Sequence, residues 1–215
     1  MIDLHTHTFL SDGALLPTEL IRRAAVMGHK AVALTDHVDA SNVEMVVPGT
    51  VKACLAVDKN WGIRAVPGAE ITHAAPEQIA GLTARIRELG GQIVVVHGET
   101  IVEPVAPGTN RAALEAGVDI LAHPGLITEE EVALAVKQGV ALEISGRKGH
   151  SLTNGWVAQA ALSASARLVI NSDAHGPGDL FNRETAEKIL WGAGVSRSDR
   201  EAVFNNSERI ISEIK

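Results

Sequence analysis

The chain has 215 residues, and its 26 acidic and 19 basic side chains give a formal net charge of −7. This length fits one domain with a substantial core, and an acidic chain without a basic run argues against a broad nucleic-acid or membrane surface. Bound divalent cations would weaken the charge argument, because they reverse the charge locally. The chain opens on a strand-like run, MIDLHTH, rather than on a leader or spanning segment. We therefore expect a soluble, cytoplasmic protein.

Apolar runs and helical patterns alternate along the chain. The runs are mostly continuous, as expected for strands covered on both faces. The expected strands cover residues 2–7, 31–36, 63–69, 92–97, 119–123, 140–144 and 167–172. The expected helices run from Pro17 to a stop at Gly28, over about 50–60, from Pro76 to Gly90, over about 110–116, from a Thr128 capping box to Gly139, and over about 154–165, 183–192 and 198–213. Such alternation predicts parallel strands with right-handed crossovers in one domain, residues 1–215.

The polar residues at the strand ends distinguish a closed barrel from a doubly wound open sheet. An open sheet concentrates its ligands at one switch point, whereas a barrel gathers the ends of all its strands around one mouth. Six of the seven expected strands end in histidine or carboxylate residues, and the remaining one ends in Glu143, followed by Arg147 and Lys148. We therefore predict an α/β fold, a distorted (β/α)7 TIM-like barrel.

These strand-end residues have the chemistry of a metal site. His5 and His7 lie on the same face of a strand because side chains alternate with period two. Imidazole and carboxylate suit divalent metals of intermediate hardness. The candidate ligands are His5, His7, Asp12, His37, Glu70, His97, His123, Asp173 and His175. Their convergence predicts a multinuclear metal site and indicates hydrolysis.

The order of the motifs HTHT with SDG, TDH, PGAEI, VHGE, HPG and SDAH resembles the PHP (polymerase and histidinol phosphatase) superfamily. The resemblance spans residues 3–175 and implies a single PHP domain with a trinuclear centre. It assigns His5, His7, Glu70 and Asp173 to one metal, Glu70, His97 and His123 to a second, and Asp12, His37 and His175 to a third. Some members have histidine where this chain has Asp12, and a harder oxygen ligand favours manganese or iron there, although zinc remains the first expectation for two to three ions.

The ligand set predicts the chemistry. Neighbouring cations lower the pKa of a bridging water and hold a phosphoryl group in line with it. We expect Glu70 to bridge two ions and a metal-bridging hydroxide to act as nucleophile, with Asp173 or His175 assisting proton transfer. The sequence offers no nucleophilic serine motif, and its one cysteine, Cys54, reads as a buried apolar side chain.

Metals do not supply all of the phosphate recognition, and a guanidinium group is the usual complement. Arg147 resembles the phosphate-binding arginine of histidinol-phosphatase-like members, and Lys148 and Arg183 are further candidates. His150, on the same loop, is a possible leaving-group acid but is expected to be exposed. The irregular stretch GETIVEPVAPGTN is a candidate specificity wall or lid.

Four functions are compatible with these residues. The leading hypothesis is a phosphomonoesterase acting on a small phosphorylated substrate, such as a histidinol-phosphate-like compound or a nucleotide. Alternatives are a phosphodiesterase or exonuclease, a C–N hydrolase of the amidohydrolase kind, and a non-catalytic metal-binding module. No membrane partner is expected, nor any nucleic acid beyond nucleotides or short oligonucleotides, and the oligomeric state is left open.

Overall fold

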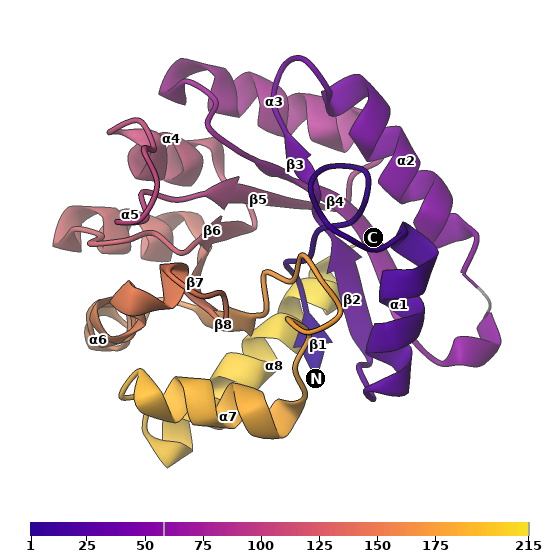
Figure 1. Ribbon diagram of the computed structural model, residues 1–215. Coiled ribbons are helices and arrows are strands. Elements are labelled where there is room, and N and C mark those ends of the chain that lie inside the picture. The colour runs from indigo at the N-terminus through magenta and orange to yellow at the C-terminus, as the bar shows by residue number, and fades with distance from the viewer. Residues whose placement is uncertain (58, 215) are drawn as a thin grey trace.

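Seven parallel strand positions form a nearly closed barrel in the computed structural model, which describes residues 1–57 and 59–214 (Figure 1). The strands of the main path are β1 (Ile2–Asp3), β2 (Ala31–Leu34), β4 (Arg64–Ile71), β5 (Ile93–His97), β6 (Ile120–Ala122), β7 (Ala141–Ser145) and β8 (Leu168–Asn171), hydrogen-bonded in that order. The helices surround them: α1 (Pro17–Val26), α2 (Val43–Leu55), α3 (Pro76–Glu88), α4 (Thr109–Ala116), α5 (Glu129–Gln138), α6 (Asn154–Ala164), α7 (Arg183–Gly192) and α8 (Arg197–Glu213). The predicted TIM-like barrel is confirmed.

The first and last strands close the barrel beyond their regular ends. The backbone N–H of Asp173 donates to the carbonyl of His5 at 3.0 Å, and that of His7 donates to the carbonyl of Ala174 at 2.8 Å. Thr6 and Ala174 form an isolated parallel bridge. The expected strand over residues 2–7 is therefore regular only at its start, and its second half joins the far end of the sheet at the level of the histidines.

The second expected strand, 31–36, is interrupted. It stops at Leu34 and resumes as β3 (His37–Val38), and both pieces pair with β4. The register is unbroken, since Leu34 lies opposite Pro67 and His37 opposite Glu70. The gap exists because Asp36 turns its carboxylate to the backbone N–H of Thr8, at 2.7 Å. The interruption ties the loop after β1 to this strand.

The helix expected over residues 50–60 is wrong in its bounds. Helix α2 begins at Val43, ends at Leu55 and contains Pro48. Proline removes one helical hydrogen bond, at a cost of roughly 3 kcal/mol. Val43, Val46 and Val47 are buried in the core, and this packing favours the longer helix.

The predicted helix signals hold at α1 and α5. Pro17 occupies the first turn of α1, and Thr128 and Glu131 form the capping box of α5, which ends at Gly139 with φ 71°.

Inside the barrel, Ile210 of α8 packs with apolar strand residues such as Val95 and Val169. Among the described residues, no helix has both the length and the apolar character needed to cross a membrane.

Candidate metal centre

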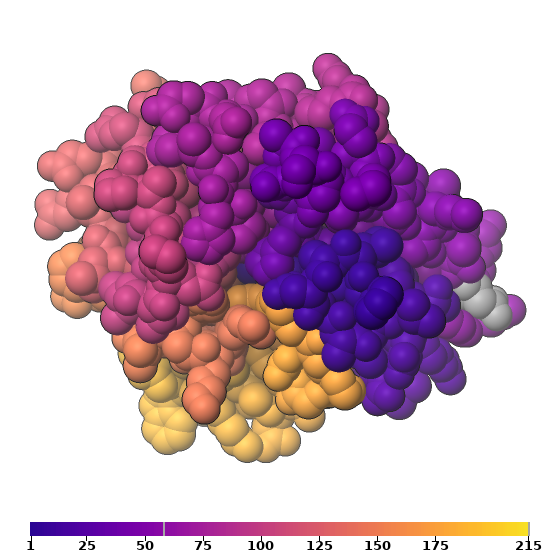
Figure 2. Space-filling view, turned by 45° about the horizontal axis from the view of Figure 1, so that its top comes forward, coloured from indigo at the N-terminus to yellow at the C-terminus, as the bar shows by residue number. Residues whose placement is uncertain are grey.

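All nine candidate ligands lie at the carboxyl end of the barrel. They come from the loop after β1, from β3, from β4, from the end of β5 and from the segments that follow β6 and β8. In Figure 2, the indigo, magenta and orange segments that carry much of this end meet at the centre of the view. The fold thus brings together side chains that are as much as 170 residues apart (His5 to His175).

The innermost group surrounds Glu70, whose carboxylate is fully buried. Its Oε1 lies 3.3 Å from Nε2 of His5, and its Oε2 lies 3.7 Å from Nε2 of His7. Oδ1 of Asp173 lies 3.2 Å from Nε2 of His7 and 3.8 Å from Nε2 of His5. Two carboxylates and two imidazoles therefore face one another across a space without solvent.

Burial and charge set the pKa values in this group. Burial lowers the pKa of His5, but the carboxylates of Glu143, Glu70 and Asp173 outweigh it and hold that pKa well above its usual range. Burial raises the pKa of Glu70, yet His5 and His37 bring it well below the ordinary value. Burial, reinforced by the neighbouring Glu70 and Glu143 carboxylates, holds the pKa of Asp173 well above the usual range, although the charge of His5 opposes it. A divalent cation between these groups would favour the deprotonated imidazole and the ionised carboxylates.

Several buried atoms of this group fit a cation. Nε2 of His5, both ring nitrogens of His7, Oε1 of Glu70 and Nδ1 of His123 make no hydrogen bond with any of the described residues. Leaving such groups unsatisfied costs about 1–3 kcal/mol each. Nitrogen and oxygen donors facing one another are the set that zinc, manganese or iron binds. The residues present therefore fit the metal centre that the sequence predicts.

A second group lies closer to solvent. Oδ1 of Asp12 lies 3.3 Å from Nε2 of His175 and 3.5 Å from Nε2 of His37. The same nitrogens of His37 and His175 are 3.4 Å apart, and His7 belongs to this group by distance. Asp36 holds the loop in place through Thr8 and Ser11, as expected of a residue that orients a ligand.

The third group departs from the sequence-based expectation. His97 and His123 lie together with His150, and the candidate ligand atoms of these three histidines are within 4.8 Å of one another. His150 is 4% exposed, so the expectation that it is an exposed loop residue is wrong. Burial, and then the charge of His97, lower its pKa to about 4. Glu103, which the sequence analysis did not single out, lies 3.1 Å from Nε2 of His97.

Two candidate ligands and one neighbouring histidine stand on strained backbone. His73, His123 and Asp173 have φ values of 52°, 28° and 52°. Non-glycine residues adopt this region at a cost of order 1–3 kcal/mol, and such residues cluster at functional sites. The fold thus maintains unfavourable backbone where it places these groups.

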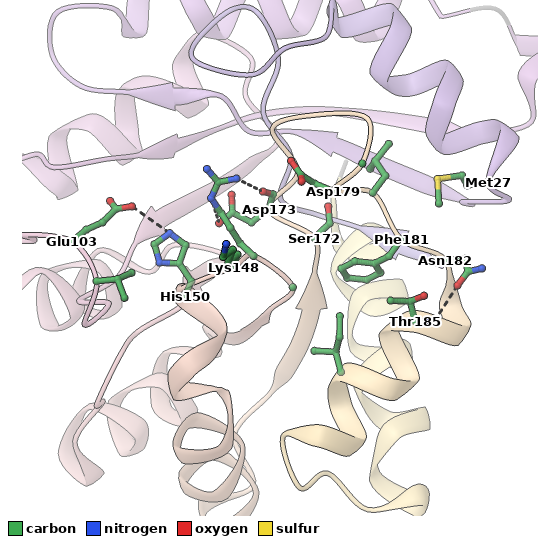
Figure 3. A pocket seen from close by; sticks show the side chains of 16 residues that line it. Met27, Glu103, Lys148, His150, Ser172, Asp173, Asp179, Phe181, Asn182 and Thr185 are labelled. Carbon is green, nitrogen blue, oxygen red and sulfur yellow. Dashed lines mark hydrogen bonds and ion pairs between the residues drawn. The ribbon is translucent and has the colours of Figure 1, made fainter.

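Two cavities open onto the centre. The smaller, about 250 Å³, is lined by ligand candidates including Asp12, His37 and His175. The larger, about 740 Å³, extends from Asp173 past Lys148 to Phe181. Figure 3 shows Glu103 and His150 on one side of the larger cavity and Met27, Phe181 and Asn182 on the other.

The three candidate substrate-binding cations lie in different places. Arg147 lines both cavities, and its Nη1 donates to the carbonyl of Asp173 at 3.4 Å. Lys148 lines the larger cavity and makes no ion pair with any described residue. Arg183 instead contacts Glu187 and Glu201 and lies over the ring of Phe204, and it lines neither cavity.

A parallel α/β barrel with buried histidines and carboxylates at the carboxyl ends of its strands defines the class of metal-dependent barrel hydrolases. A family model described as the PHP domain matches residues 3–147. The chain therefore belongs to the PHP family. The family and the donor set together define a metal-dependent phosphoesterase.

Similar proteins cover nearly the whole chain. An uncharacterised protein of Methanocaldococcus jannaschii, MJ1295, is 44% identical over 93% of this chain and 92% of its own length. A protein of Thermoanaerobacter sp. strain X514 named probable phosphatase is 27% identical over 91% of this chain and 87% of its own. Among solved structures, a chain in the cryo-EM structure of archaeal ribonuclease P with mature tRNA superposes with a TM-score of 0.76 at 17% identity, covering 99% of this chain and 90% of that one. At that identity the likeness concerns the fold alone.

Proposed function

We propose that this protein is a phosphatase that hydrolyses a small phosphomonoester at a three-ion centre. The observation that carries the proposal is the set of buried nitrogen and oxygen atoms around Glu70 that make no hydrogen bond with any described residue, with the guanidinium of Arg147 at its edge. A similar protein named probable phosphatase supports the same activity.

The donor groups suggest how the ions divide. His5, His7, Glu70 and Asp173 would hold the first ion, and Asp12, His37 and His175 the third. Glu70 would also serve the second ion together with His97 and His123, since its Oε1 lies 3.7 Å from Nε2 of His123. When bound, the ions would supply a nucleophilic water of near-neutral pKa and polarise the phosphoryl oxygens. Zinc is the first candidate, with manganese or iron at the third position, where Asp12 offers an oxygen in place of the histidine of some family members.

Arg147 would bind the phosphoryl group. Its side chain is 33% exposed and lines both cavities, so it lies where a substrate passes from one to the other. A guanidinium matches two phosphoryl oxygens at once and gains strength from the charge that develops there. Asp173 lies beside it, with Oδ2 3.9 Å from Nε of Arg147, which places one carboxylate between the guanidinium and the histidines.

The larger cavity would hold the leaving group. Phe181, Leu180 and Met27 offer apolar surface, while Lys148 and Thr185 offer hydrogen-bond donors. Its volume of about 740 Å³ lies within the range of small-molecule sites. A histidinol-phosphate-like compound and a nucleoside phosphate both combine a ring for Phe181 with polar groups for Lys148. Asp173 or His175 would return a proton to the leaving oxygen.

The decisive experiment measures phosphate release from protein loaded separately with zinc, manganese and iron. The substrates are L-histidinol phosphate, nucleoside mono- and bisphosphates, and a short oligonucleotide. We expect selective turnover of one monoester. If every monoester is untouched and the oligonucleotide is shortened, the protein is a nuclease on the same fold. Metal binding without hydrolysis of any substrate would favour a non-catalytic metal-binding module.

A further inference from the structure

His150 lies inside the third group of histidines rather than at its edge. Its ring stacks on that of His123 with centroids 4.0 Å apart and meets that of His97 nearly at a right angle, at 5.5 Å. His97 and His123 are themselves 4.5 Å apart. All three side chains are buried. Three buried imidazoles this close to one another resemble a ligand set more than a packing cluster.

A hydrogen bond at Nδ1 fixes the orientation of the His150 ring. Nδ1 lies 2.9 Å from Oγ1 of Thr100, which is also buried. When Nδ1 donates its proton to this hydroxyl oxygen, Nε2 carries the lone pair. Metal-binding histidines usually have their second nitrogen held in this way. Nε2 is therefore the atom of His150 that is available to an ion.

The loop of residues 98–108 brings a carboxylate to the same place. Glu103 has Oε2 3.1 Å from Nε2 of His97 and Oε1 3.5 Å from Nε2 of His150. The loop is anchored at both ends, because Oε1 of Glu99 accepts the backbone N–H groups of Gly108 and Asn110 at 3.0 Å each. Glu103 is thus held in front of the histidines by the loop that the sequence marks as a candidate wall.

Glu70 lies close to His123 but not to His97. Among the described residues, Glu103 is the carboxylate that lies within 4.0 Å of a ring nitrogen of His97, whereas Glu70 reaches His123. The ligand set that the family resemblance implies for the second ion, Glu70 with His97 and His123, leaves His150 and Glu103 unexplained. Glu103 lies on a loop and His150 begins a short 3-10 helix after β7, η2 (His150–Thr153), so both stand outside the strand-end pattern.

We propose that His150 is a metal ligand, and that the second ion is held by His97, His123 and His150 beside Glu70, with the Glu103 carboxylate as a further donor. Three histidines with one exchangeable position form the ligand set of catalytic zinc sites. This ion would accordingly prefer zinc, while the third position, which contains Asp12, prefers a harder cation. The inference rests on the proposed metal centre but not on phosphate release.

The direct test leaves the sequence unchanged. Wild-type protein containing ¹⁵N-labelled histidine is loaded with ¹¹³Cd, and nitrogen–cadmium coupling is recorded for each ring. Of the nine histidines in the chain, we expect coupling at His150 and at the six histidines of the family ligand set. We expect no coupling at His29 or His73. Coupling at the six without His150 would overturn the proposal.

A pair of variants tests the same point by stoichiometry. His150→Gln should bind one zinc ion about 10–100-fold more weakly than the wild type, in the range seen when the environment of a ligand is disturbed. His73→Gln is the matched control, since His73 contacts the same Glu103 carboxylate at 3.2 Å but is 41% exposed. Zinc content after gel filtration and competition with a chromophoric chelator give the readout, and circular dichroism checks the fold. Unchanged zinc binding in a folded His150→Gln protein, or an equal loss in His73→Gln, would contradict the assignment.

These outcomes separate the inference from the proposed function. Cadmium coupling at His150 in a protein that hydrolyses no phosphoester would exclude the proposed phosphatase function but support His150 as a metal ligand. Turnover of a phosphomonoester by a protein whose His150 shows no coupling would support the phosphatase function and exclude His150 as a ligand. Should His150→Gln fail to fold, the cadmium measurement on the wild type decides alone.

Discussion

The carboxylate of Glu143 accepts a hydrogen bond from Nδ1 of His5 at 2.8 Å, and both side chains are fully buried. Asn171 donates to the same carboxylate oxygen at 2.9 Å and so fixes its position. Because Nδ1 of His5 is engaged, Nε2 points to Glu70 and Asp173. Glu143 is therefore a positioning residue that determines which nitrogen of His5 an ion meets.

Replacement of Glu143 should weaken metal binding without removing a ligand. We expect Glu143→Gln to lower the affinity for one ion about 10–100-fold, because the amide cannot stabilise the imidazole as the carboxylate does. Competition with a chelator measures the effect. Glu130→Gln, on the exposed first turn of α5, is the control and should bind like the wild type. Equal affinities in the two variants would show that Glu143 only packs against His5.

Glu70 should be more sensitive, because it lies within 4.0 Å of four of the histidines. In addition to His5, His7 and His123, its Oε2 lies 2.7 Å from Nδ1 of His37. Glu70→Gln should therefore lose bound metal and turnover together. Metal content by mass spectrometry and phosphate release are measured on the same preparation. Full stoichiometry combined with normal turnover would exclude Glu70 as a shared ligand.

That the strand-end residues lie together could be predicted from the sequence for a physical reason. Buried parallel strands read as apolar runs, so a histidine or carboxylate at the end of a run is conspicuous, and closure of a barrel brings all such ends together. His5, Glu70 and Asp173 meet for this reason. The confirmed barrel class follows from the same pattern.

Loop residues escaped this reasoning. Glu103 belongs to a stretch with no periodicity, and its approach to His97 depends on the Glu99 anchors 9 and 11 residues apart in sequence. His150 follows a glycine in a polar segment and reads as exposed, but Thr100, 50 residues away, covers it. The Asp36 interruption of the second strand likewise depends on a contact with Thr8. Long-range side-chain contacts decide these features, and local patterns do not record them.

Replacement of Arg147 should lower kcat/KM for the substrate without changing metal binding. Arg147→Ala is expected to lower kcat/KM about 10–100-fold for phosphorylated substrates, which corresponds to about 1.4–2.7 kcal/mol for a lost charge-assisted contact. Metal content should match the wild type. Arg111→Ala, which removes an exposed arginine paired with Glu115 on α4, is the control. Unchanged kinetics in Arg147→Ala would direct attention to Lys148, which also lines the larger cavity, as the phosphate-binding residue.

The thiol of Cys54 should react slowly with alkylating reagents. Burial raises the pKa of its thiol to about 12, so almost none of it is thiolate at pH 8. Because the thiolate is the reactive form, alkylation by iodoacetamide should be at least about 100-fold slower in the native protein than in guanidinium chloride. Mass spectrometry follows the modification over time. Rapid alkylation under native conditions would show that α2 opens near its end or that the thiol is activated.

Substitution of Gly146 tests whether the leaving group binds against Phe181 in the larger cavity. A Cβ at this position would overlap the ring of Phe181. The backbone cannot yield easily, because the N–H of Gly146 donates to the carbonyl of Asn171 at 2.9 Å. Gly146→Ala should therefore push Phe181 toward the cavity. We expect a loss of about 1–3 kcal/mol in the free energy of unfolding and a higher KM.

Gly155→Ala provides the matched control for this substitution. Gly155 lies in α6, and a Cβ there would have only the carbonyl oxygen of Ala193 within range, at 4.0 Å. Because alanine favours helix over glycine, this variant should be as stable as the wild type or slightly more stable, with an unchanged KM. Chemical denaturation and initial-rate kinetics compare the two variants. If Gly146→Ala loses stability but keeps its KM, Phe181 supports the fold and the leaving group binds elsewhere, whereas a raised KM in Gly146→Ala alone places the leaving group against the Phe181 ring.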